Sequence, residues 1–245
     1  MFHGEVIDER KLKFRIYIPF GRDVELLSAC IRSIALRISV FTSEKRPIVI
    51  MNNTGNTVKH LIPSPELCEE VLPFVHLQHA QEVNWMIKMA RENEEPFCMM
   101  LHTDAELVDG AIEDLLEKYH EVKETRWAQI LQYASGVFCA VNPYFFEMEE
   151  VEFDAFLFPF YFMDNHMYQI MESRGWTVHL TRLSGQISLP HKSSHYLKDD
   201  LIFQRKNEFA FKYSLALYSE IWGGGPGAET RKNDPWANGT LKRSW

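Results

Sequence analysis

Two carboxylates, Asp104 and Glu106, stand one residue apart at the end of the short apolar segment Pro96–Leu101. An apolar run of this length, bounded by proline and by charge, is typical of a buried strand. Residues i and i+2 of an extended chain point to the same side, so the two carboxylates are expected to do so. Their oxygens suit a hard divalent cation, and the carboxyl edge of an open α/β sheet is where ligands bind. The alternative is that Asp104 caps a turn and Glu106 is solvated.

Two loops near the N-terminus are expected to open at the same edge of the sheet. The first, Pro19–Arg22, follows the alternating segment 14–19, and the second, Asn52-Asn53, follows the apolar segment 47–51. Asparagine amides can pair with a nucleobase or a ribose, and an aromatic ring can stack on a base. Ordinary turn chemistry is the alternative, because asparagine and glycine are the residues that turns use.

Three later features are candidates for chemistry. Asp164 follows the aromatic segment 153–162 and starts a helical pattern, so it is a candidate general base whose pKa is raised by desolvation, or a helix N-cap. His191 is a candidate metal ligand through its neutral imidazole, or a plain surface residue. The glycine-rich segment 223–227 is either a loop that closes over a diphosphate or a flexible C-terminus.

The elements that must position these residues alternate between strand and helix through residue 124. This order predicts βαβ units and a mostly parallel sheet with helices on its faces, hence an α/β fold. Strands are expected at 14–19, 47–51, 74–77 and 96–101, and helices after the caps Asp23 and Asp109 and around 83–90.

The second half of the chain has a different pattern. Strand-like residues 129–141 are broken at Ser135-Gly136, a short helix is expected to end at Gly175, and a strand at 177–180 precedes a long helix over 201–222. One domain is expected, because no repeat or linker divides the chain. It comprises a nucleotide-binding half at about 14–124, an acceptor half at about 125–222, and a glycine-rich loop and tail at 223–245.

Composition narrows the classes of function. The chain has 245 residues and a formal net charge of −8, which argues against a broad basic face for nucleic acid. Its four cysteines are scattered in apolar settings, as expected for buried, reduced thiols. No apolar run approaches the roughly 20 residues of a membrane helix, and residues 1–5 lack the apolar part of a signal peptide. A cytoplasmic protein is therefore expected.

Taken in order, these segments resemble the family-2 glycosyltransferases of GT-A fold, which use nucleotide-diphosphate sugars. The resemblance extends from Arg15 to about Glu229. Its matching residues are Ile16–Phe20, Ile50–Gly55, Asn84, Leu101–Glu106, Phe153–Phe156, Met163-Asp164, Arg174–Trp176 and His191.

The resemblance implies roles for particular residues. Asp104 and Glu106 stand where the family holds Mn²⁺ or Mg²⁺ against the donor diphosphate, and His191 resembles a late histidine that turns toward this metal. Asp164 stands at the position of the catalytic base of inverting enzymes. The residues expected to bind the donor are Pro19, Phe20, Arg22, Asn52, Asn53, Asn84, Thr103 and Asp104.

The acceptor and the oligomeric state stay open: a glycan, a protein, a small molecule or a modified DNA base are all compatible with these residues. One alternative is a DNA glycosyltransferase that acts on a hydroxymethylated base. Its mark would be a basic patch formed by Arg174, Arg182, Lys192, Lys198, Arg205 and Lys206. Another alternative is a nucleotide-sugar-binding or nucleotidyltransferase-like protein without glycosyl transfer, although the loop Phe20–Asp23 is poor in the glycine that triphosphate loops use.

Overall fold

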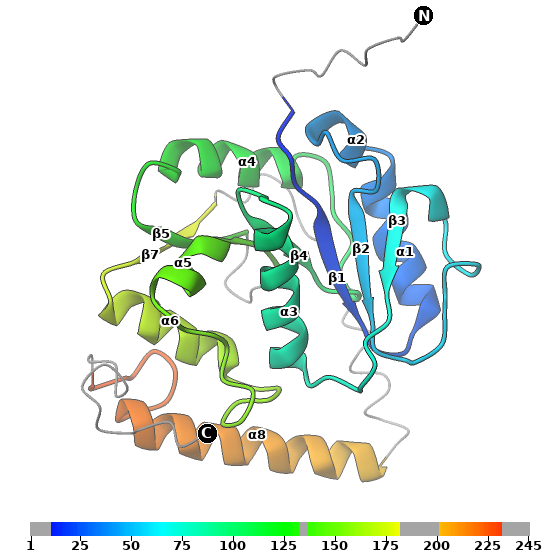
Figure 1. Cartoon of the computed structure of the whole chain (residues 1–245). Helices are drawn as coiled ribbons and strands as arrows, with labels where there is room; N and C mark the ends of the chain where they lie inside the picture. Colours follow the sequence, from blue (N-terminus) through cyan, green and yellow to red (C-terminus); the bar gives the residue numbers. More distant parts are fainter. Residues whose placement is uncertain (1–10, 133–136, 182–200, 232–245) are drawn as a thin grey trace, which may run out of the picture.

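The chain folds around one mixed, mostly parallel sheet (Figure 1). The structure, a computed structural model, describes residues 11–132, 137–181 and 201–231. In these residues seven strands lie in the order β3-β2-β1-β4-β6-β5-β7, and β6 runs antiparallel to both of its neighbours. The strands are β1 (Ile16–Phe20), β2 (Ile48–Asn52), β3 (Cys68–Val71), β4 (Cys98–Leu101), β5 (Trp127–Leu131), β6 (Phe138–Val141) and β7 (Thr177–Leu180).

Helices cover both faces of the sheet (Figure 1). One core contains residues of α1, α2 and α4, and the other contains residues of α3, α5, α6 and α8. These helices are α1 (Val24–Ala35), α2 (Ile38–Phe41), α3 (His79–Glu92), α4 (Ala111–Val122), α5 (Pro143–Met148), α6 (Met163–Ser173) and α8 (Leu201–Trp222). The α/β fold expected from the sequence is confirmed.

The central strands are apolar on both sides because each side meets a helical layer. In β1, Ile16 and Ile18 belong to the core under α1, whereas Tyr17 belongs to the core under α3. The turn after β1 is closed by Asp23, whose Oδ1 accepts the backbone N–H groups of Glu25 and Leu26 at 2.9 and 3.0 Å. The expected cap of α1 is therefore confirmed.

The third strand differs from the prediction. Residues 74–77 form no strand, and Phe74 and Val75 are exposed. The strand lies earlier, at β3, where its acidic residues hid the pattern. Glu70 accepts hydrogen bonds from the Val58 backbone and the Asn52 side chain, so its carboxylate joins β3 to the neighbouring β2 and to the loop after it. Because carboxylates occupy these positions, the segment lacks the alternation of apolar and polar residues from which a strand is predicted.

Two helix starts also differ. Asp109 does not cap α4: the cap position is Gly110, with φ 89°, and Asp109 pairs with Arg37 instead. The cap position of α6 is Phe162, with φ 61°, so Asp164 is the second residue of that helix and not its cap. Gly175 has φ 75° and follows the end of α6 as expected.

Parallel pairing brings the ends of the first strands to one edge of the sheet. In β1 and β2, Pro19 pairs with Met51 and Phe20 with Asn52, and β4 lies on the other side of β1. The loops after these strands therefore open together, close to the N-terminus of α3 (Figure 1). In the described ranges, no helix combines the length and the apolar character needed to span a bilayer.

Candidate active site

A pocket of about 400 Å³ lies at the carboxyl ends of β1 and β4, and we call it the Asp104 pocket. Asp104 and Thr103 enter it from the loop after β4, and Arg22 enters it from the loop after β1. The rest of its wall comes from the end of β1 and the loop after it, from the residue after β4, and from the starts of α1 and α3. The residues on this part of the wall are Pro19, Gly21, Asp23, Leu26, His79, Glu82 and His102.

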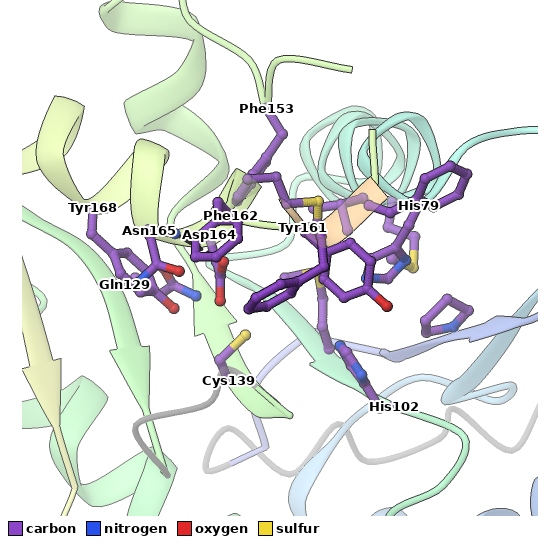
Figure 2. Close-up of a pocket in the computed structure, with 17 residues that line it drawn as sticks. His79, His102, Gln129, Cys139, Phe153, Tyr161, Phe162, Asp164, Asn165 and Tyr168 are labelled. Carbon is purple, nitrogen blue, oxygen red and sulfur yellow. Dashed lines mark hydrogen bonds between the residues drawn. The ribbon is translucent and has the colours of Figure 1, made fainter. Parts of the chain in front are cut away.

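A second pocket of about 400 Å³, which we call the Asp164 pocket, lies under α6 (Figure 2). Asp164 and Tyr168 enter it from α6, Gln129 from β5 and Cys139 from β6. Aromatic side chains form much of the remaining wall: Phe153, Phe160, Tyr161, Phe162 and Phe211.

The two pockets adjoin, because Pro19, His79 and His102 line both of them. The imidazoles of His79 and His102 meet edge to face, with their ring centroids 5.4 Å apart. A ligand that extends from one pocket to the other therefore passes these two rings. The arrangement places Asp104 and Asp164 in neighbouring chambers of one site.

Asp104 and Glu106 project from a turn and not from an extended strand. The Ala105 N–H donates to the carbonyl of His102 at 3.1 Å, which folds the chain at Thr103-Asp104. The strict alternation expected here ends at β4, because the strand stops at Leu101. The two carboxylates nevertheless lie near the same thiol. Burial raises the pKa of Cys30, and the negative charges of Asp104 and Glu106 raise it further.

Oxygen donors at this loop suit a hard cation, but the described residues do not supply a full set of ligands. In residues 11–132, 137–181 and 201–231, no group of three or more His, Cys, Asp or Glu side chains is arranged to hold a metal. Asp104 lines the pocket, whereas Glu106 is not part of the lining. His191 lies outside the described residues. Its assignment as a ligand stays a prediction.

Asp164 is held in the desolvated part of the site. Burial raises the pKa of its carboxyl, and three weaker effects oppose the rise: hydrogen bonds from the Asn165 and Asp164 backbone and the charge of His79. The Asn165 N–H donates to Asp164 Oδ1 at 2.9 Å. A carboxylate in such a setting is a better proton acceptor than an exposed aspartate.

The side chains of Asn52 and Asn53 are occupied by the protein itself. Asn53 Nδ2 donates to the Leu77 carbonyl at 2.6 Å, and the Leu77 N–H donates to Asn53 Oδ1 at 2.8 Å. Asn52 is fully buried, with its amide bonded to Glu70 and to the Asn56 carbonyl. These contacts join the loop after β2 to the residues that precede α3. Donor binding by Asn52 and Asn53 stays a prediction.

Of the other residues expected to bind the donor, some line the Asp104 pocket and some lie away from it. Pro19, Arg22 and Thr103 line the Asp104 pocket, and Thr103 Oγ1 donates to the Pro19 carbonyl at 3.3 Å. Phe20 is 1 % exposed and packs in the core beneath α1. Asn84 lines neither of the two pockets, because its amide binds the Phe153 backbone at 2.8 Å in both directions.

The glycine-rich segment lies at the C-terminal end of α8 (Figure 1). The Trp222 carbonyl accepts the N–H groups of Thr230 and Arg231 at 3.1 and 2.9 Å. Tyr218 Oη and Glu229 lie 2.5 Å apart, and the same carboxylate accepts the Gly227 N–H. Segment 223–227 contributes no residue to either pocket. The segment is folded back on its own helix in this structure.

Sequence reasoning missed four residues that help form the site: His79, His102, Gln129 and Tyr168. His102 adjoins the carboxylate motif, and that position was its only signal. The other three lie in elements whose patterns only indicated helix or strand. Their neighbourhood arises because β6 enters the sheet between β4 and β5, a topology that local periodicity does not encode.

Comparisons with known proteins give a fold and no family. No family model matches the chain, and no curated protein matches it. One similar solved structure is a mannosyltransferase, PcManGT from Pyrobaculum calidifontis, in complex with GDP-Man and Mn²⁺. Its TM-score is 0.54 at 8 % identity, over 71 % of this chain and 57 % of that chain. This chain thus spans less than two thirds of the mannosyltransferase.

A second match is a cytidylyltransferase from Leptospira borgpetersenii serovar Hardjo-bovis (strain JB197). It has 13 % identity over 69 % of this chain and 75 % of that chain. Its TM-score of 0.43 is too low to support an argument about this chain. The likeness to the mannosyltransferase shows that the chain has a Rossmann-like fold of GT-A type, as expected.

Proposed function

We propose that the chain is a glycosyltransferase that moves a sugar from a nucleotide-diphosphate donor to an acceptor hydroxyl, with inversion at the anomeric carbon. One observation carries the proposal: the Asp104 pocket and the Asp164 pocket adjoin across His79 and His102. A two-substrate transfer needs two chambers that meet where the bond is exchanged. An acidic loop at one chamber and a buried carboxylate in the other fit a donor and an acceptor.

The donor diphosphate is assigned to the Asp104 pocket. Asp104 and Glu106 would hold Mn²⁺ or Mg²⁺, whose preferred ligands are carboxylate and phosphate oxygens. Two carboxylates are suitable ligands for such a cation. Asp104 and Glu106 both lie near Cys30, because the negative charge of each adds to the rise that burial causes in the pKa of this thiol. Arg22, which lines the same pocket, adds a positive charge for the diphosphate. PcManGT, which shares the fold, was solved with GDP-Man and Mn²⁺.

The acceptor is assigned to the Asp164 pocket. The acceptor hydroxyl gives its proton to the Asp164 carboxylate, and its oxygen forms a bond to the anomeric carbon of the donor sugar. The bond from that carbon to the phosphate oxygen breaks, and its electron pair leaves with the nucleotide diphosphate. When bound, the divalent cation supplies Lewis-acid stabilisation of the charge on the departing diphosphate.

The two alternatives have less support. A binding protein needs no second chamber with a buried carboxylate, and the loop Phe20–Asp23 is poor in the glycine that the triphosphate loops of nucleotidyltransferases use. For a DNA acceptor, Arg174 is already engaged, because its Nη1 donates to the Glu149 carbonyl at 2.6 Å and pairs with the Glu149 carboxylate. Arg182, Lys192 and Lys198 lie outside the described residues. Arg205 and Lys206 are exposed on α8.

The proposal is tested by melting the protein with UDP-, GDP-, CMP- and dTDP-sugars, each with and without Mn²⁺. A ligand that binds only the folded state raises the melting temperature. We expect at least one nucleotide sugar to raise it, and to do so more strongly with Mn²⁺. Release of nucleotide diphosphate is then measured with that donor and a mixture of glycosides. No stabilisation by any donor, together with no release of nucleotide, would contradict the proposal.

A further inference from the structure

Two polar atoms in the Asp164 pocket lack the partners that buried groups normally have. Within the described part of the chain, Gln129 Oε1 and Tyr168 Oη are shielded from solvent and make no hydrogen bond. Gln129 is 3 % exposed, and both residues line the pocket that contains Asp164. Figure 2 shows Gln129 and Tyr168 on the same side of the pocket as Asp164.

The position of these atoms follows from their elements. Gln129 lies in β5, and its side chain hydrogen-bonds to Cys139 of the neighbouring β6. Burial raises the pKa of the Cys139 thiol, and this hydrogen bond opposes the rise. The Gln129 amide is thereby oriented, and its carbonyl oxygen is left over. Tyr168 lies one helical turn after Asp164 in α6, so both side chains share one face of the helix. Burial raises the pKa of the Tyr168 phenol, and the negative charge of the nearby Asp164 raises it further.

An unpaired buried acceptor and an unpaired buried hydroxyl destabilise a fold, and natural proteins rarely keep them without a reason. Here the two groups have complementary capacities. Gln129 Oε1 can only accept a hydrogen bond, whereas Tyr168 Oη can donate one. A ligand hydroxyl satisfies both at once, because it donates to the first and accepts from the second.

We propose that Gln129 and Tyr168 bind a second hydroxyl of the acceptor, next to the hydroxyl that Asp164 deprotonates. The acceptor is accordingly a carbohydrate that presents two neighbouring hydroxyls, and not an isolated alcohol. This inference rests on the proposed glycosyltransferase function and names the class of its acceptor. Gln129 and Tyr168 are positioning residues, because they hold the acceptor and do not exchange the proton.

The rest of the pocket suits a sugar ring. Phe211 of α8 packs against Tyr161 and Phe162, with ring centroids 5.5 and 5.2 Å apart, and all three rings line the pocket. Flat aromatic surfaces pack well against the C–H face of a pyranose, while polar groups at one end bind its hydroxyls. Aromatic walls with a small polar end are what this pocket offers.

Direct binding of methyl glycosides tests the inference without a donor. Saturation-transfer NMR would compare methyl α-glycosides of glucose, mannose and galactose with cyclohexanol, which has one hydroxyl. We expect at least one glycoside to bind and cyclohexanol not to bind. In Tyr168→Phe the glycoside affinity should fall by about 2- to 10-fold, the usual worth of one neutral hydrogen bond. Tyr144→Phe, at an exposed tyrosine of α5, is the matched control and should bind as the wild type does.

Stability separates ligand binding from a structural role. Because Tyr168 Oη has no partner in the described residues, Tyr168→Phe should leave the melting temperature unchanged or raise it. A second variant, Gln129→Leu, should likewise lose glycoside affinity. A lower melting temperature in Tyr168→Phe would mean that the hydroxyl holds the fold. That result, equal binding of cyclohexanol, no glycoside binding, or unchanged affinity in Tyr168→Phe would overturn the inference.

The inference and the function fail in different ways. If glycosides bind through Tyr168 but no donor yields transfer, the proposed function fails and the hydroxyl site stands. If transfer occurs and the KM for the glycoside acceptor is the same in Tyr168→Phe and in the wild type, the function stands and the hydroxyl site fails. We expect the KM for the acceptor to rise more than the KM for the donor.

Discussion

His79, the first residue of α3, meets His102, the residue after β4, edge to face at 5.4 Å. Both rings line the Asp104 pocket and the Asp164 pocket, so this pair marks the boundary between the two chambers. Desolvation and the nearby His79 ring lower the pKa of His102 to about 4. The His102 ring is therefore neutral at pH 7 and adds no charge at the boundary.

Asp104→Asn should abolish most metal-dependent turnover, because the amide loses the negative charge that holds a cation against the diphosphate. We expect Mn²⁺-dependent donor hydrolysis to fall by about 100-fold or more. Glu113→Gln removes an exposed carboxylate from the first turn of α4 and is the matched control. Full metal-dependent turnover in Asp104→Asn would remove this residue from the site.

Asp164→Asn should have opposite effects on turnover and on stability. Loss of the base should lower kcat by about 10²- to 10⁴-fold. The pKa of Asp164 in the folded protein is raised above its unfolded value, so the buried charge opposes folding at neutral pH. The variant should therefore melt at a higher temperature than the wild type at pH 7. This gap should narrow as the pH falls through the raised pKa, and vanish below about pH 4.

A variant that melts lower at pH 7 would show that the Asp164 charge stabilises the fold. Calorimetry of both proteins between pH 4 and pH 8 decides the point. Donor affinity, measured by titration, should stay near the wild-type value, since Asp164 lies in the pocket proposed for the acceptor and not in the Asp104 pocket.

The pH dependence of turnover should reflect the same carboxyl. Because burial raises the pKa of Asp164, kcat/KM should fall on the acid side at a pH above the ordinary aspartate value of about 3.9. The profile is measured with saturating Mn²⁺. If the residual activity of Asp164→Asn shows the same acid limb, another group is responsible for it.

Asn53→Asp should destabilise the fold. The Leu77 carbonyl accepts from Asn53 Nδ2 at 2.6 Å, and an aspartate would place a negative oxygen there with no proton to give. We expect a loss of about 1–3 kcal/mol in the free energy of unfolding, measured with urea. Asn56→Asp, at an exposed position of the same turn, should change it little. Equal stability of the two variants would mean that the paired bonds to Leu77 contribute nothing.

Glu95→Ala tests a structural carboxylate far from the site. Arg15 Nε and Glu95 Oε1 are 2.7 Å apart, at the amino end of β1 and before β4, and Glu95 is fully buried. Removing Glu95 takes the fully buried partner from Arg15, which keeps only Glu69 and the Tyr17 hydroxyl, at a cost of up to about 3–5 kcal/mol. Urea unfolding measures this loss, and turnover per folded molecule should be retained. A selective loss of turnover would mean that the two edges of the sheet are coupled.

Most of the fold was predictable from the sequence because its signals are local. The apolar strands β1, β2 and β4 and the Asp23 cap were all predicted, since each rests on neighbouring residues. Strand β3 was misplaced because Glu69 and Glu70 interrupt its apolar pattern. Their partners, Arg15 and Asn52, are distant in the chain and invisible to a local pattern.

The site was predictable only in part, for the same reason. Asp104 and Asp164 were proposed from their place at element boundaries, and the structure puts them in adjoining pockets. Gln129 and Tyr168 were missed because nothing in their own segments distinguishes them. Their proposed role rests on buried polar atoms that make no hydrogen bond in the described residues, and this is visible only in the folded chain.

A crystal structure with a bound nucleotide sugar and Mn²⁺ tests the central claim most directly, with anomalous scattering to locate the manganese. We expect a manganese peak in contact with both the Asp104 carboxylate and the diphosphate, with the anomeric carbon facing the pocket that contains Asp164. A diphosphate bound elsewhere, or manganese without contact to Asp104, would contradict it.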